Sequence, residues 1–208
     1  NKITNEYLIY YFSQKTAKCP TLFSLHHFFK PNAEDYLKEK KLPKELALIP
    51  VVCSAYNPNS SNKIGGYGHW HLNHPQAVKY GLTVNEYIDE RKNWEKSTKA
   101  AINYLSDLYK KYNNWELTLA AYSSGVVNIR KLLNRSEEKT YAAIVDKLPE
   151  ETKDFIQAFV AMNYIYNYDD YGVVELSPMR SIDSVVFDKK VMFKAINDVA
   201  HTKTNNYY

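Results

Sequence analysis

The sequence predicts a mainly helical fold, and three stretches of the chain carry that prediction. Residues 94–112 and 148–168 repeat apolar side chains at helical spacing along one side. In the first stretch these are Ala101, Tyr104, Leu105, Leu108 and Tyr112, and in the second Phe155, Phe159, Met162 and Ile165. The third stretch, Leu42 to Pro58, has no polar face, so a helix there would be buried on most sides.

This third stretch is expected to form a single bent helix. One side of it carries, at helical spacing, Leu46, Ile49, Pro50 and Cys53. Pro50 removes one backbone donor and should bend the helix. The Asn57-Pro58 pair should end it, because a residue before proline avoids the α region. The last buried turn would then present Cys53 and Ser54 beside a loop, which is a common way to build a site.

Shorter helices are expected at residues 6–12, 22–29, 32–41, 115–123 and 126–133. The Cys19-Pro20 pair should separate the first two of them. Asn113 and Asn114 should end the helix at 94–112, and Gly125 should cap the end of the helix at 115–123. Residues 59–68 are rich in Ser, Asn and Gly, which is typical of a loop.

Composition excludes some classes of protein. A chain of 208 residues can form one sizeable domain, or one domain with appendages. Its net charge of +4 comes without a stripe of Arg and Lys interleaved with aromatic residues, so we expect no nucleic-acid partner. No run of about 18 apolar residues occurs, so we expect no transmembrane span in this stretch of chain.

Aromatic residues and cysteines leave alternatives open. Aromatic side chains make up 14% of the chain, and most of them belong to its 19 tyrosines. They would serve core packing, or they would stack on the apolar faces of sugars in a groove. Cys19 and Cys53 could pair, but two cysteines do not make a disulfide framework.

Four blocks of residues match one known pattern in the same order along the chain. The first block matches at Leu42, Pro43, Glu45, Leu46, Pro50, Ser54, Ala55, Tyr56 and Pro58. The second matches at Gly68, Trp70 and Leu72, and the third is the run Ala120 to Gly125, which matches at every position except Ser123. The fourth matches at Leu148, Pro149, Glu151, Thr152, Lys153, Phe155 and Ile156. Together the blocks resemble the lytic transglycosylase family, whose goose-lysozyme-like domain cleaves peptidoglycan.

The resemblance implies a lysozyme-like helical core at residues 42–170. Residues 1–41 would be an N-terminal helical extension. Residues 171–208 would be a C-terminal appendage, with a strand at 181–187 and a helix at 191–199, that resembles the start of a LysM-like module. The expected partners are peptidoglycan glycan strands and an envelope protein, with no cofactor. We expect export to the periplasm or cell envelope, with the export leader outside this sequence.

The family is known for one catalytic glutamate, and Cys53 stands at its position. In the family this carboxyl protonates the glycosidic oxygen and then accepts the proton of the C6 hydroxyl as a 1,6-anhydro ring closes. A thiol is shorter than a carboxyl and a weak hydrogen-bond donor, and its usual pKa of about 8.5 keeps it protonated. We therefore expect transglycosylase activity to be absent or severely reduced while glycan binding remains. The alternatives are an active transglycosylase that uses another acid, and an envelope interaction protein whose groove no longer holds sugar.

Other positions also depart from the family pattern. His71 replaces a glutamine that lies beside the scissile bond in the family, Ser123 stands where asparagine is usual, and Phe155 stands near a usual tyrosine. Glu151 is the best substitute acid, although a helix N-terminal carboxylate explains it as well. The residues expected to line a sugar groove are Ser54, Tyr56, Trp70, Tyr122 and Ser123, with core packing as the alternative for the three rings.

Two other chemistries stay open at this point. Cys53 and His71 could form a nucleophilic thiol–imidazole pair, because these two positions face each other across the groove of the family fold. Alternatively, a metal could be bound by Cys53, His69, His71 and His74, since Cys and His are zinc ligands.

Overall fold

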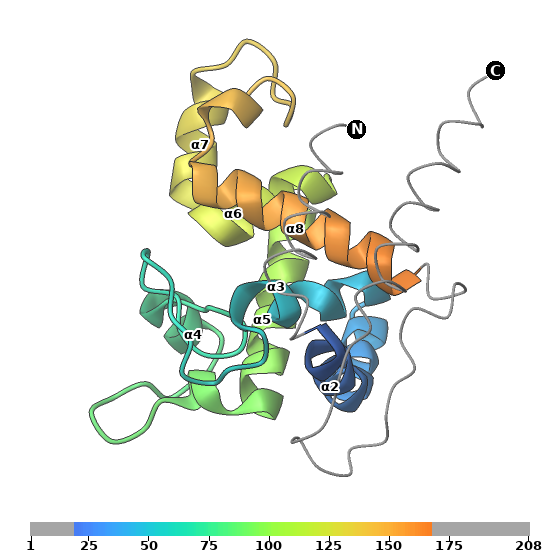
Figure 1. Cartoon of the computed structure of the whole chain (residues 1–208). Coiled ribbons are helices and arrows are strands. Elements are labelled where there is room, and N and C mark those ends of the chain that lie inside the picture. The colour runs from blue at the N-terminus through green and yellow to red at the C-terminus, as the bar shows by residue number, and fades with distance from the viewer. Residues whose placement is uncertain (1–18, 168–208) are drawn as a thin grey trace, which may run out of the picture.

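A long central helix, α5 (Trp94–Tyr112), organises the computed structural model, which describes residues 19–167 (Figure 1). Helices α2, α4 and α6 and the 3₁₀ turn η2 all pack against α5. The Asn93 side chain caps its start by accepting from the backbone N–H of Lys96, and Asn113 ends it in a left-handed conformation. The predicted limits of this helix are confirmed.

Helix α2 (Cys19–Glu39) is one continuous helix where the sequence predicted two. The segments at 22–29 and 32–41 merge through Pro31, which lies inside the helix. Pro20 lies in the first turn of α2, where a missing N–H leaves no helical hydrogen bond unmade. Buried Leu37 and Ala33 pack α2 onto the rest of the core. The segment predicted at 6–12 lies outside the described residues.

The stretch from Leu42 to Pro58 is not one bent helix. It divides into the 3₁₀ helix η1 (Lys44–Leu48) and the helix α3 (Ile49–Ser54). Pro50 lies in the first turn of α3, where its missing N–H is harmless, so it begins a helix and does not bend one. The end also comes earlier than predicted, because Ala55 and Tyr56 take left-handed φ angles of 51° and 61°. Cys53 and Ser54 do form the last turn, as expected.

The remaining helices complete a mainly helical domain. They are α4 (His74–Lys79), η2 (Glu90–Lys92), α6 (Trp115–Ser124), α7 (Val126–Asn134), η3 (Val145–Lys147) and α8 (Glu150–Asn167). Helices α6, α7 and α8 agree with their predicted positions. Helix α4 was not predicted, although Asn73 and Gln76 form a capping box at its start. No regular strand occurs in residues 19–167, and the strand and helix predicted beyond residue 180 lie outside that range.

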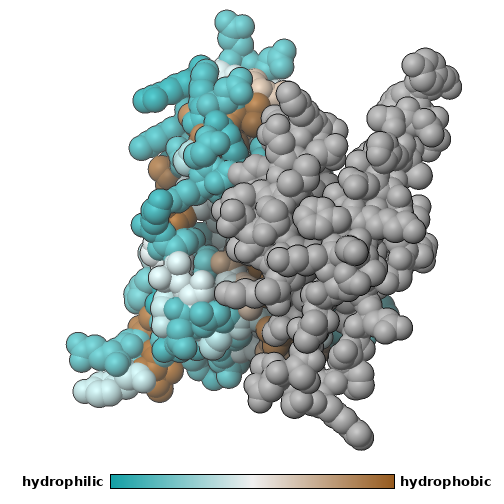
Figure 2. All heavy atoms as spheres, viewed as in Figure 1, coloured by the Kyte–Doolittle hydropathy of each residue, from teal (hydrophilic) through white to brown (hydrophobic). Residues whose placement is uncertain are grey.

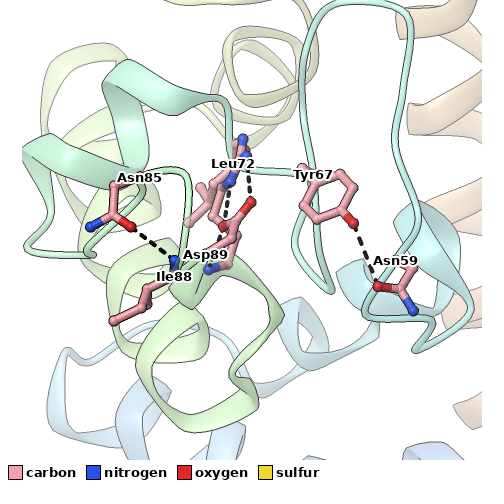
Figure 3. A network of polar contacts seen from close by, with 7 residues as sticks. Asn59, Tyr67, Leu72, Asn85, Ile88 and Asp89 are labelled. Atoms are coloured by element: carbon pink, nitrogen blue, oxygen red, sulfur yellow. Dashed lines mark hydrogen bonds and ion pairs between the residues drawn. The ribbon is translucent and has the colours of Figure 1, made fainter.

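Loops between α3 and α5 are held by isolated β-bridges and a polar network (Figure 3). The Arg91 guanidinium donates twice to the Asp89 carboxylate, at 2.7 and 2.9 Å, and once to the Leu72 carbonyl oxygen, at 3.3 Å. A side chain that bonds both segments fixes the loop containing Leu72 to the turn that precedes α5. Within the described residues, no helix has the length and apolar character that a membrane span requires.

Gly68 lies where two of these loops nearly touch. Its φ is +79°, and a Cβ atom there would come within 2.1 Å of the Arg91 carbonyl oxygen. Gly65, three residues earlier, has a similar φ of +83° but nothing within 4 Å of its Cβ position. A side chain at either glycine would strain the backbone, but only a side chain at Gly68 would also clash with a neighbour.

We predict that Gly68→Ala destabilises the protein more than Gly65→Ala does. Backbone strain alone should cost about 1–2 kcal/mol at either position. The clash with Arg91 should add about 1–3 kcal/mol at Gly68 only. Urea unfolding of both variants beside the parent protein measures the difference, and equal losses at the two positions would contradict the close approach of the loops.

Candidate functional site

A cleft with a volume of about 970 Å³ opens beside the C-terminal end of α3. One side is formed by α3 and by the loop that follows it, including residues 62–64 and His71. The other side is formed by the end of α6 and by α7 and α8 (Figure 1). The lining mixes apolar rings with hydroxyls, amides and carboxylates. This volume and composition are typical of a small-molecule or oligomer site.

Cys53 lines this cleft as a free, partly buried thiol in the last turn of α3. Burial in apolar surroundings raises the pKa of the thiol to about 12. At neutral pH the side chain is therefore a protonated thiol, neither a thiolate nucleophile nor a ready proton donor. The position expected to carry the catalytic acid does lie in a cleft. The thiol found there is a much weaker acid than a carboxyl group.

Tyr122 and Ser123, at the end of α6, also line the cleft. The Tyr122 hydroxyl donates to the Trp70 carbonyl oxygen at 2.6 Å, and its ring stacks on Phe155, with 6.2 Å between centroids. Ser123 Oγ lies 3.4 Å from Thr152 Oγ1, so α6 and α8 meet through these hydroxyls. The two rings supply an apolar surface of the kind on which a sugar ring packs.

His71 enters the same cleft from the loop side, with its Nε2 atom 2.9 Å from the Ser60 hydroxyl oxygen. Burial lowers the pKa of His71 to about 4, so the ring is neutral at pH 7. The structure thus brings Cys53 and His71 into one cleft, as the sequence suggested. Burial keeps both of them uncharged, which argues against a thiolate–imidazolium pair.

Glu151 lies in the first turn of α8 and lines the cleft from the side opposite the loop. Its Oε1 atom forms an ion pair with Lys63 Nζ at 2.9 Å, and its side chain is 50% exposed. Asp154 lines the cleft one turn further along α8. Lys63 was not predicted as a site residue, because its loop has no periodic pattern that would assign it to a face.

Tyr56 and Trp70 do not line the cleft, contrary to expectation, and both are buried core residues. Trp70 is 0% exposed and donates from Nε1 to the Thr98 hydroxyl of α5 at 2.9 Å. The Tyr56 hydroxyl lies 2.6 Å from Nδ1 of His26 on α2. The packing alternative is therefore the one that the structure supports for these two rings.

Ser54 is buried as well and does not line the cleft, but its hydroxyl bonds to backbone beside it. Its hydroxyl oxygen lies 3.0 Å from the Pro50 carbonyl oxygen and 2.8 Å from the His69 carbonyl oxygen. A hydroxyl in this position fixes the loop that carries His71 to the end of α3. Ser54 is thus placed to position the cleft, and it does not reach a ligand there.

The geometry does not support the metal alternative. His69 is buried against the Trp94 ring, with 5.4 Å between centroids, and His74 is exposed at the start of α4. Across residues 19–167, no three His, Cys, Asp or Glu side chains are grouped so that they could hold a metal ion. Cys53 and His71 therefore lack the further ligands that the motif suggested.

The helices and the cleft form a lysozyme-like domain. The transglycosylase SLT domain matches residues 31–145, so the chain belongs to that family. Its fold is similar to that of the 70 kDa soluble lytic transglycosylase of Escherichia coli, with a TM-score of 0.57, 21% identity, and coverage of 67% of this chain and 24% of that one. An inactive variant of the lytic transglycosylase Slt of Pseudomonas aeruginosa gives a TM-score of 0.54, 17% identity, and coverage of 72% and 25%. The lysozyme-like fold expected from the sequence is confirmed.

The chain is also similar to the membrane-bound lytic murein transglycosylase D of Escherichia coli strain K12. The two are 33% identical over 141 residues, which cover 66% of this chain and 31% of that protein. The corresponding protein of Escherichia coli O6:H1 matches to the same extent. The chain thus spans about a third of the length of these curated relatives.

We predict slow alkylation of Cys53 in the folded protein. In a Cys19→Ser variant, which leaves Cys53 as the one thiol, iodoacetamide at pH 8 should react about 10²–10³-fold more slowly than in 8 M urea, because a pKa near 12 leaves little thiolate. Mass spectrometry of quenched samples gives both rates. A folded-state rate equal to the rate in urea would show that the thiol is neither buried nor raised in pKa.

Proposed function

We propose that this domain binds peptidoglycan glycan strands in the cleft beside α3 and has lost most or all of its ability to cleave them. One observation carries the proposal: the Cys53 thiol lines the cleft at the end of α3, where the family resemblance places the acid. Binding needs the cleft and its lining, whereas cleavage needs an acid at this position.

Cleavage depends on how readily the group at this position gives up its proton. A general acid has to release its proton as the glycosidic bond breaks, and an optimal acid has a pKa near the working pH. Burial raises the pKa of Cys53 to about 12. The thiol is therefore a weaker acid than a buried carboxyl group by several powers of ten. General acid–base help accounts for roughly 10²–10⁴ in rate, and a mechanism with one carboxyl has no second group to supply it.

Glu151 is the remaining carboxyl that the sequence suggested as a substitute. It enters the cleft from α8, whereas Cys53 enters from α3, and its Oε1 atom is engaged by Lys63. A residual cleavage activity that passes through Glu151 is the alternative to complete loss. The variant Glu151→Gln separates them, because any turnover that survives this change does not depend on that carboxyl.

The lining of the cleft supports glycan binding. Tyr122 and Phe155 provide stacked rings, and hydroxyl and amide groups that can bond to sugar oxygens come from Ser123, Thr152 and Asn128. The two Escherichia coli relatives are named as membrane-bound murein transglycosylases, and we place this domain in the same compartment, the cell envelope. An envelope protein that docks on the domain remains part of this proposal.

We predict that the domain sediments with insoluble peptidoglycan but releases no anhydromuropeptides from it. Sedimentation followed by chromatography of the soluble fraction measures both. Retention without product supports a binding domain, and failure to sediment would contradict glycan binding. Product formation at a rate similar to that of the Escherichia coli relative would contradict the loss of activity.

We further predict that Cys53→Glu raises turnover by about 10²-fold or more over the parent, because it restores a carboxyl at the end of α3. Cys53→Ala is the matched control and should leave turnover unchanged. Circular dichroism of each variant checks that the helices are intact. If Cys53→Glu folds and stays inactive, the departures at His71, Ser123 and Phe155 also block the reaction.

A further inference from the structure

The Lys63–Glu151 ion pair joins the two sides of the cleft. Lys63 lies in the loop that follows α3, and Glu151 lies in the first turn of α8. The Lys63 side chain is 88% exposed and that of Glu151 is 50% exposed, so the pair lies at the mouth of the cleft and not on its floor. A strand that enters between the loop and α8 has to pass this pair.

The backbone that carries Lys63 is held by hydrogen bonds and close packing, whereas its side chain is mostly exposed. The neighbouring Asn62 side chain accepts from the backbone N–H of Ile64 at 3.2 Å and of Gly66 at 2.7 Å. A Cβ atom at Gly66 would come within 2.4 Å of the His71 carbonyl oxygen, so this turn packs tightly against the segment that carries His71. The Lys63 ammonium can therefore exchange partners without any movement of the loop.

Charge makes Lys63 distinctive among the residues that line the cleft. It is the one Lys or Arg in the described lining, which also includes the carboxylates of Glu151 and Asp154. Exposed ion pairs of this kind are weak and easily exchanged, because both ions keep most of their water. A carboxylate on a ligand can thus take the place of Glu151 at little cost.

We propose that Lys63 exchanges Glu151 for a carboxylate of the incoming glycan strand, so that the cleft selects carboxylate-bearing strands over neutral ones. This inference rests on the proposed function and names its substrate class. The carboxylate can come from the lactyl ether of the sugar or from an attached peptide. Where it is described, the face of the molecule in Figure 2 is largely hydrophilic, with scattered apolar residues.

The test compares three soluble ligands by titration calorimetry at low salt: chitotetraose, which has no carboxylate, a peptide-free muramyl tetrasaccharide, and the same tetrasaccharide with peptides. The parent protein should bind one or both muramyl ligands about threefold to tenfold more tightly than chitotetraose. Lys63→Met, which keeps the length of the side chain, should abolish that difference and leave the affinity for chitotetraose unchanged.

Two further variants sharpen the comparison. Glu151→Gln releases Lys63 and should tighten binding of the muramyl ligands by about threefold, with no gain for chitotetraose. Lys153→Met is the matched control, because Lys153 pairs with Glu150 at 3.2 Å on the same turn of α8 and does not line the cleft. It should leave all three affinities unchanged.

The outcomes distinguish this inference from the function on which it rests. Which muramyl ligand loses affinity in Lys63→Met identifies the lactyl or the peptide carboxylate as the partner. Equal binding of all three ligands by the parent, or loss of all three together in Lys63→Met, would overturn the inference and leave glycan binding intact. Binding of none of them would overturn the proposed function and the inference together.

Discussion

The cleft depends on the hydrogen bond from the Tyr122 hydroxyl to the Trp70 carbonyl oxygen, at 2.6 Å. It joins α6 to the loop after α3 across 52 residues of sequence, inside the protein. The Ser54 hydroxyl holds the neighbouring carbonyl, that of His69, against the end of α3. With two consecutive carbonyls held from two helices, the backbone that leads into His71 is fixed beside the cleft that His71 lines. A buried hydroxyl that lost its acceptor would cost about 1–3 kcal/mol, so these bonds also specify the arrangement.

The contacts that hold this fold together do not depend on an acid at position 53. Trp70, Tyr56 and the apolar side of α5 form the core, and none of these contacts involves the side chain of Cys53 as a proton donor. A thiol at this position is therefore compatible with the helices, the loop and the cleft. For this reason the fold alone does not imply the function. The activity of each member of a family depends on the residues in its site.

Sequence reasoning was most successful for helices with a strong apolar period and a clear end signal. Helix α5 starts at an Asn cap and ends at a left-handed Asn113, and its predicted limits were right. The errors gathered at prolines, because Pro50 occupies a first turn, where proline is harmless, and Pro31 lies inside a helix held by packing. Periodicity alone does not tell whether a proline begins, bends or interrupts a helix.

The candidate site was predictable where a motif matched. Cys53, His71, Tyr122, Ser123 and Glu151, far apart in the sequence, all line one cleft. The rings of Tyr56 and Trp70 were assigned to the groove wrongly, since a motif does not reveal which way an aromatic side chain points. Lys63 was missed because its role depends on a contact with Glu151 that lies 88 residues away in the sequence.

The most direct measurement of the central claim is a crystal structure of the unaltered protein soaked with a muramyl tetrasaccharide. If Cys53 has replaced the acid, an unbroken strand will lie in the cleft, with a glycosidic bond next to the sulfur of Cys53. A cleaved strand with a 1,6-anhydro end, or a strand bound away from Cys53, would contradict it.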